Sequence, residues 1–303
     1  SGAGSSGTYE LSGTGSLSVG ISELIGGFGT GAFTQTGGTH TVSIELSLGN
    51  ESGNCGTYVL SGGELSAGFE HIGGRGTGAF TQNGGTNTVS NRLSLGYMSG
   101  SSGTYELSGG ELSAGYEHIG RRGTGAFTQT DGTNTVSNAL NLGNESGSSG
   151  TYELSGGDLS AGWEYIGNEG TGAFTQTGGT NTVSNRLYLG RISGSSGFYD
   201  LSGAGNLSVT DIEYIGYRGT GEFTQTDGSH TVSNTLNLGY YNGSGTYGLS
   251  GTGSLSVIGD EFIGNYGTGA FTQNGGTHTV SNELSLGNES GSSGTYGLSG
   301  GEL

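Results

Sequence analysis

The sequence predicts an all-β chain that forms a parallel β-solenoid (β-helix), with three sides and about two coils per 47–49-residue repeat. Three observations lead to this fold class. One unit recurs along the 303 residues, short segments within it alternate apolar and polar residues, and the chain has 72 Gly but no Pro. A period of this length is typical of stacked architectures, and the alternation indicates strands. The absence of Pro suits strands that all donate backbone N–H groups to a neighbour.

The repeats form a single continuous array over residues 1–303. The clearest copy reads GTYELSGGELSAGYEHIGRR followed by GTGAFTQTDGTNTVSNALNLGNESGSS. Copies begin at Gly7, Gly56, Gly103, Gly150, Gly197 and Gly245, and a partial copy begins at Gly294. Because the sequence starts and stops within a repeat, we expect it to be a window of a longer chain.

Each repeat divides into two similar halves, GTYELSGGELSAGYEHIG and GTGAFTQTDGTNTVSNALNLG. Each half contains three short runs of period two, and Gly-rich segments separate the runs. Period two places alternate side chains on opposite faces of a strand, and Gly suits corners that need a positive φ. We therefore expect each half to form one three-sided coil, with successive coils about 4.8 Å apart.

Stacking would align equivalent residues of successive coils into ladders. Tyr105, Leu107, Phe127 and Val136 represent four apolar ladders that recur in the other repeats. Each fully buried side chain of this size stabilises a fold by about 1.5–3 kcal/mol. A few such residues per coil suffice, because the stability of a solenoid sums over neighbouring repeats.

Three polar ladders accompany the apolar ones. Gln129 and Asn138 each follow a core residue by two positions, so parity places them on the core face, where we expect their amides to bond to backbone. Glu117 stands before an Ile-Gly corner, and we expect it to cap backbone N–H groups there. Repeated cation sites are the alternative for the Glu ladder, which comprises Glu23, Glu70, Glu117, Glu164, Glu213 and Glu261.

The repetition argues against an enzyme, because an active site is a unique place and these residues recur in register. Equivalent carboxylates lie two coils, or about 9.6 Å, apart. The five His recur with the same spacing, too far apart to share a zinc ion, so we expect polar surface positions for them. We predict no catalytic, cofactor-binding or metal-binding residues. The His positions are His40, His230 and His278 in one slot, and His71 and His118 in another.

Composition excludes several partners. The formal net charge is −18 and the chain has no Lys, which opposes binding to nucleic acid and to anionic membranes. No apolar run approaches the length of a membrane span, so we expect no membrane insertion. Cys55 is the only Cys, and we expect a tolerated residue in a loop, with an intermolecular disulfide as the alternative.

The segment that closes each repeat varies most, reading NESGNC, YMSGSS, NESGSS, RISGSS, YYNGS and NESGSS. These segments occupy one corner of the coil, so we expect them to line one edge, and any specific recognition would lie there. Three of them carry the Asn-x-Ser pattern of N-glycosylation, at Asn50, Asn144 and Asn288.

The alternation of GTYxLSGGxL with GTGxFTQxGGTxTVSxxLxLG resembles the repeats of autotransporter passengers and filamentous-haemagglutinin β-helices. The resemblance implies a secreted bacterial protein at the cell surface or in an extracellular fibre. We expect a structural rod that forms a filament by end-to-end stacking, with further copies of itself as its partner. A cell-surface adhesin stalk and a carbohydrate-binding β-helix, with surface glycans as partners, are the alternatives.

Overall fold

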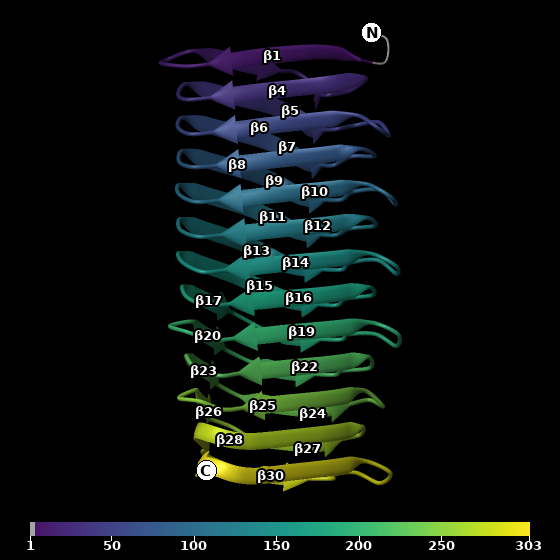
Figure 1. Cartoon of the computed structure of the whole chain (residues 1–303), viewed down its shortest axis with the longest axis vertical. Helices are drawn as coiled ribbons and strands as arrows, with labels where there is room; N and C mark the ends of the chain where they lie inside the picture. Colours follow the sequence, from purple (N-terminus) through teal and green to yellow (C-terminus); the bar gives the residue numbers. More distant parts are fainter. Residues whose placement is uncertain (1–3) are drawn as a thin grey trace. The chain divides into compact units, whose positions relative to one another are not determined.

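The computed structural model describes residues 4–303, which form strands and turns and contain no helix able to span a lipid bilayer. The chain divides into two compact units, Ser1–Tyr152 and Glu153–Leu303. Within each unit every pairing between named strands is parallel, and the strands stack as successive coils (Figure 1). Each unit is therefore a parallel β-solenoid with about 24 residues per coil, which confirms the predicted fold class.

The first unit begins with short strands and continues with alternating shorter and longer ones. The division between the units falls within β14. The strands are β1 (Ser5–Leu11), β2 (Ser16–Val19), β3 (Ser22–Ile25), β4 (Gly29–Gln35), β5 (Thr39–Leu48), β6 (Cys55–Leu60), β7 (Glu64–Ile72), β8 (Thr77–Gln82), β9 (Thr86–Leu95), β10 (Ser102–Leu107), β11 (Glu111–Ile119), β12 (Thr124–Gln129), β13 (Thr133–Leu142) and β14 (Ser149–Leu154).

The second unit repeats this order, but most of its long strands are interrupted in the middle. The strands are β15 (Asp158–Ile166), β16 (Thr171–Gln176), β17 (Thr180–Val183), β18 (Leu187–Leu189), β19 (Ser196–Leu201), β20 (Asn206–Val209), β21 (Ile212–Ile215), β22 (Thr220–Gln225), β23 (Ser229–Val232), β24 (Thr235–Tyr240), β25 (Ser244–Leu249), β26 (Ser254–Val257), β27 (Glu261–Asn265), β28 (Thr268–Val280), β29 (Leu284–Leu286) and β30 (Ser293–Glu302).

Each coil has three straight sides. The first side is a short strand such as β10, which pairs in register with β8 and β12. The second and third sides follow as one bent strand such as β11, or as two strands such as β17 and β18. The bend shows as a register shift between Ala114 and Tyr116. Three runs per half-repeat thus become three sides, as the sequence predicts.

Asn138 departs from the predicted alternation at this bend. It was expected on the core face with Val136, yet it is half-exposed, and the equivalent Asn91 is exposed. The strand carries an extra residue at this point, because Ser90 and Asn91 together lie opposite Gly115. A bulge of this kind leaves one residue unpaired and redirects side chains. The Asn ladder therefore lies on the outside of the bend, and the prediction for it was wrong.

The corners require Gly, as Gly120 illustrates. Its φ is +68°, and a Cβ atom built on it would lie 1.9 Å from the carbonyl oxygen of Ser149 in a neighbouring coil. Any other residue would be strained at this φ and would clash with backbone. The coil spacing therefore fixes Gly at the turn between the third side and the next first side.

The core of each unit contains a column of stacked aromatic rings. In the first unit the ring centroids of Phe80, Tyr105 and Phe127 are 4.7 and 4.8 Å apart along the column. This spacing matches the expected separation of coils. Tyr105, Phe127, Leu107 and Val136 are at most 1% exposed, which confirms all four apolar ladders. The second unit contains an equivalent column, from Phe174 to Tyr296.

Candidate functional site

A Gln side chain joins adjacent coils at the first corner of each repeat. Gln82 donates through Nε2 to the carbonyl oxygens of Gly85, at 3.2 Å, and Glu111, at 2.9 Å. Its Oε1 accepts a hydrogen bond of 2.5 Å from the Tyr105 hydroxyl. Gln129 is fully buried and bonds in the same manner to Gly132. The predicted structural role of the Gln ladder is confirmed.

The Glu ladder lies inside the coil and does not cap the corner. Glu117 is 0% exposed, and its Oε2 accepts a hydrogen bond of 3.2 Å from Nδ2 of Asn134. Asn134 also donates to the Tyr152 hydroxyl at 3.2 Å. Glu117 stands two residues before the buried Ile119, so the strand period turns it inward. The predicted capping role was therefore wrong.

The first group of His residues is also buried, although surface positions were predicted. His40, His230 and His278 are at most 1% exposed. Nδ1 of His40 lies 2.9 Å from the Tyr58 hydroxyl, and Nε2 lies 2.7 Å from Oε2 of Glu23. His40 precedes the core residue Val42 by two positions, so the same period places it inside.

These contacts form a buried polar network in each of six repeats. Each network consists of one Glu, one Tyr, one Gln and either a His or an Asn. The Glu and the His or Asn are always 17 residues apart in sequence, a constant offset that could have revealed the pairing. Three networks contain Asn: Glu70–Asn87–Tyr105–Gln82, Glu117–Asn134–Tyr152–Gln129 and Glu164–Asn181–Tyr199–Gln176. Three contain His: Glu23–His40–Tyr58–Gln35, Glu213–His230–Tyr247–Gln225 and Glu261–His278–Tyr296–Gln273.

In the networks with Asn, the carboxyl group gains protons readily. Glu70 is 1% exposed, and burial raises its pKa to about 7, partly offset by the hydrogen bond from Asn87. Burial likewise raises the pKa of Glu164 to about 8, against the hydrogen bond from Asn181. A buried carboxylate with few donors is costly, so protonation is the favourable response.

In the networks with His, the imidazole ring lies between a Tyr hydroxyl and a Glu carboxyl group. The Tyr58 hydroxyl donates to Oε1 of Gln35 at 2.5 Å, so it accepts from Nδ1–H of His40. Nε2 then faces the Glu23 carboxyl group and hydrogen-bonds to its Oε2 at 2.7 Å. The other two networks repeat the arrangement, with Nε2 2.8 Å from Oε2 of Glu213 or of Glu261.

The networks offer little to a substrate. The Glu side chains at positions 70, 117, 164, 213 and 261 are at most 1% exposed, and that of Glu23 is 18% exposed. Within residues 4–303, no three His, Cys, Asp or Glu side chains gather in a way that could hold a metal ion. The polar groups of each network can hydrogen-bond to one another, bind and release protons, and align successive coils.

His71 and His118 occupy the third side, where surface positions were predicted. His71 is only 7% exposed, because it lies between the Tyr97 ring, 3.8 Å away between centroids, and Oε1 of Glu45, 3.2 Å from Nδ1. The prediction was wrong for this residue. His118 is half-buried, and burial together with the charges of two nearby Arg residues lowers its pKa to about 3.

The variable loops lie at the corner between the third side and the next first side. Asn50 and Asn144 are half-buried there and Asn288 is exposed, so glycosylation stays a prediction. Cys55 is a free, exposed thiol at the start of β6. A group of Tyr and Arg side chains that the repeat pattern does not reveal gathers at this corner in the second unit, with Arg191 and Tyr217 among its members.

The chain matches no protein-family model, no curated protein and no solved structure. The resemblance to autotransporter passengers and filamentous-haemagglutinin repeats therefore stays a prediction. The parallel solenoid of repeating coils and its buried networks are the established features from which a function can be inferred.

Proposed function

We propose that this chain is an extracellular structural protein whose solenoid coils stack end to end in a surface fibre. One observation carries the proposal: coils of two types alternate, and each type fits the other on both of its faces. Tyr105 of one coil pairs with Phe80 on one side and with Phe127 on the other, in the same register. A coil of a second copy could therefore add through the same hydrogen bonds and ring contacts.

The buried networks support a mechanical role without catalysis. Their polar groups recur in register and contact one another across adjacent coils. They favour a single alignment of successive coils, because a shifted coil would leave buried Glu and Gln groups without partners. A rod that keeps its register over many coils is what a fibre requires.

The extracellular location rests on two supports of a different kind. The repeats resemble those of exported surface proteins, and the net charge of −18 favours solubility over binding to nucleic acid or anionic membranes. Immunogold labelling of intact and permeabilised source cells would test this part separately. Labelling confined to the cytoplasm would contradict it.

Electron microscopy and fibre diffraction of the purified chain test the assembly. We expect filaments with an axial repeat of about 4.8 Å, the separation of coils. Their length should grow with protein concentration and on addition of sheared filaments as seeds. Globular monomers at every concentration, with or without seeds, would overturn the proposal.

A further inference from the structure

A group of Tyr and Arg side chains, which we name the Tyr–Arg edge, lies at the loop corner of the second unit. Its rings and guanidinium groups contact one another across adjacent coils; for example, Arg218 lies over the rings of Tyr217 and Tyr241 at 5.6 and 5.4 Å. Exposed aromatic patches of this kind mark interaction sites, and Tyr and Arg are enriched among the residues that dominate interfaces. Its members are Arg191, Tyr217, Arg218, Tyr240, Tyr241 and Tyr266.

The backbone of this edge is strained. Tyr241, Asn242 and Tyr266 have φ values of 46°, 65° and 66°, and they are the only non-Gly residues with positive φ among those described. This conformation is unfavourable for a bulky residue and persists where the surroundings impose it, often at functional sites. The N–H of Asn242 donates to the Tyr266 carbonyl at 2.8 Å, which holds the two loops together. Tyr241 and Tyr266 nevertheless remain 45% exposed.

Two guanidinium groups of the edge lack an acidic partner. Arg75 and Arg186 make ion pairs of 3.4 and 3.0 Å with Glu51 and Asp211, respectively. By contrast, Arg191 bonds to the neutral Oδ1 of Asn168 at 2.8 Å, and over residues 4–303 neither Arg191 nor Arg218 forms an ion pair. In a chain with a net charge of −18, this leaves two positive groups free to contact an anionic partner.

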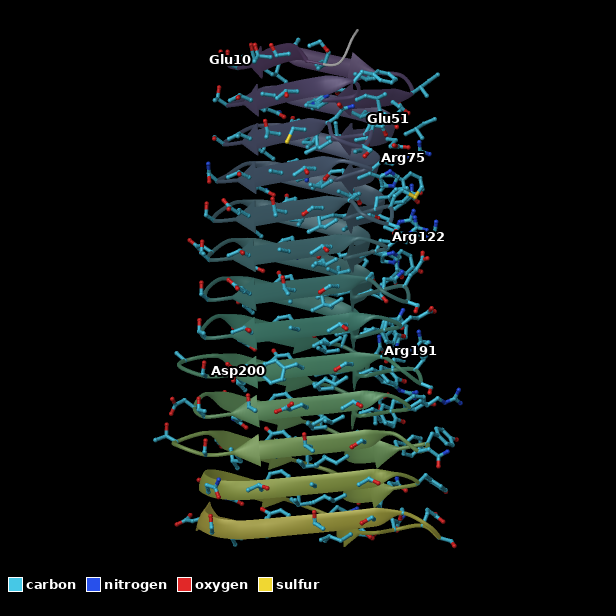
Figure 2. All side chains as sticks on the ribbon, turned by 45° about the vertical axis from the view of Figure 1, so that its right-hand side comes forward. Glu10, Glu51, Arg75, Arg122, Arg191 and Asp200 are labelled. Carbon is cyan, nitrogen blue, oxygen red and sulfur yellow. The ribbon has the colours of Figure 1, made fainter. Side chains whose placement is uncertain are left out.

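The first side of the same coils carries matching negative charge. Asp200 on β19 and Glu222 on β22 lie on adjacent strands, one coil apart, and alternate with the buried residues of each strand. These strands directly follow the loops that hold Arg191 and Arg218, so both pairs have the same axial separation of about 4.8 Å. Figure 2 shows Arg191 and Asp200 on different sides of the second unit.

The rings of the edge are poorly placed to stack on sugars. Tyr217 and Tyr240 stack on each other with centroids 5.5 Å apart, and Tyr241 stacks on Tyr266 at 5.9 Å. Arg218 lies over Tyr217 and Tyr241 as well. The ring faces are therefore largely covered, and what the edge presents is ring edges, hydroxyl groups and guanidinium groups. This chemistry suits a protein surface with carboxylates better than a glycan.

We propose that the Tyr–Arg edge is a lateral contact that binds the acidic first side of a second copy, with Arg191 on Asp200 and Arg218 on Glu222. Charge complementarity and the shared axial spacing identify the occupant. The contact would join rods side by side and bury the strained Tyr loops. The inference deepens the proposed fibre function, but filament width reports on it, whereas filament length reports on end-to-end stacking.

The lateral contact should depend on salt concentration in a characteristic way. Two copies of net charge −18 repel each other, and the Debye length falls from about 30 Å at 0.01 M salt to about 8 Å at 0.15 M and about 3 Å at 1 M. Moderate salt screens this long-range repulsion but spares carboxylate–guanidinium contacts shorter than about 4 Å. High salt weakens those contacts as well. We expect the fraction of laterally paired rods to be greatest near 0.15 M.

The test compares variants by cryo-electron microscopy at 0.15 M salt, with light scattering as a second readout of mass per length. Arg191→Gln combined with Arg218→Gln should reduce the fraction of paired rods at least tenfold and leave filament length unchanged. Arg75→Gln is the control, because its guanidinium already pairs with Glu51. Glu169→Gln should increase pairing, because it removes an exposed negative charge beside Asn168, which binds Arg191.

A charge exchange completes the test. A copy with Arg191→Glu and Arg218→Glu should not pair with itself, and pairing should return when it is mixed with a copy that carries Asp200→Arg and Glu222→Arg. Unchanged pairing in the double Gln variant, or no recovery in the mixture, would overturn the proposal. Wild-type rods that stay single at every salt concentration yet bind polygalacturonate through Arg191 would likewise overturn it, in favour of an acidic glycan.

Discussion

The networks with Asn and those with His occupy the same place in the coil but treat their Glu differently. In the Asn form, Asn87 donates one hydrogen bond to Glu70 and one to Tyr105, and it can neither supply nor accept a proton. In the His form, Nε2 of His230 lies 2.8 Å from Oε2 of Glu213, so the carboxyl group faces a ring nitrogen that can carry a proton. A single substitution thus separates a buried acid beside a neutral amide from a buried acid beside an imidazole ring, which can exchange a proton with it.

The solenoid core tolerates either His or Asn at this position. Both forms leave Tyr and Gln in the same positions, and both keep adjacent coils in the same register. The difference is confined to where the proton resides. We therefore expect substitutions in the two forms to differ mainly in how their effects depend on pH.

The largest effect should come from Asn87→Leu. The variant removes the only donor to the buried Glu70 carboxylate and one donor to Tyr105. We expect a loss of about 3–5 kcal/mol at pH 8, the scale of a broken buried charge contact, and a smaller loss at pH 5, where Glu70 is protonated. Native-state hydrogen exchange of the β9 and β11 amides measures it. Asn91→Leu, at the exposed bend, is the control, and equal losses at both pH values would contradict the explanation.

The next effect is the pH dependence of the Asn form itself. The pKa of Glu70 is about 7 in the fold, above the ordinary value of 4.5. Its contribution to stability is therefore fully present below pH 4.5 and is lost as the pH rises through 7, by about 3 kcal/mol at 1.36 kcal/mol per unit. For Glu164 the loss extends to about pH 8. Hydrogen exchange of β7 and β9 between pH 4.5 and 9 should show the decline.

Glu70→Gln should abolish this decline, because Gln resembles the protonated acid. The variant should be more stable than the wild type at pH 8 and similar to it at pH 5. Glu213→Gln, in a His network, is the matched comparison and should gain nothing at pH 8. A gain of the same size in both variants would show that the two forms do not differ in their protonation.

The repeats made it possible to predict the fold from the sequence. The same repeats also hold the information that places the network residues inside the solenoid. The spacing of Tyr105, Leu107 and Phe127 predicted strands, faces and coils correctly, because each of these depends only on period two and on Gly corners. The inward position of Glu117 followed from the same period, since it precedes Ile119 by two residues. It was missed because a charged residue was assumed to remain near solvent.

Other features lay beyond what a sequence pattern contains. The exposure of Asn138 depends on an extra residue in a bulge, and parity alone does not reveal a bulge. The Tyr–Arg edge brings Arg191 close to Tyr165, 26 residues away, at 4.5 Å, and this contact exists only because the coils stack. Contacts between coils thus become predictable only once the length of each corner is known.

A smaller effect should follow from exchanging the two forms. His230→Asn converts a His network into an Asn network and leaves Glu213 without its proton partner. We expect a loss of about 2 kcal/mol at pH 8, the scale of one hydrogen bond to a charged group, and little loss at pH 5. Hydrogen exchange of β21 and β23 measures it. The reverse variant, Asn87→His, should reduce the pH dependence of β7 and β9, and an unchanged pH profile would contradict the assignment.

The smallest difference concerns the hydroxyl at the centre of each network. Tyr105→Phe removes the hydroxyl that donates to Gln82 and accepts from Asn87. The Asn87 amide then has one N–H without an acceptor, and it cannot move that hydrogen to another atom. Tyr247→Phe removes the equivalent hydroxyl from a His network. There, His230 can release its Nδ1 proton and keep a proton on Nε2 that faces Glu213, so only the Gln acceptor is left unpaired.

We therefore expect Tyr105→Phe to cost about 1.5 kcal/mol and Tyr247→Phe about 1 kcal/mol at pH 8, since each hydrogen bond contributes about 0.5–1.5 kcal/mol. Nitrogen-15 chemical shifts of His230 would show the change of tautomer directly. Equal costs together with an unchanged tautomer would mean that the proton is fixed by Glu213 alone. In that case the His form would differ from the Asn form in charge but not in its capacity to adapt.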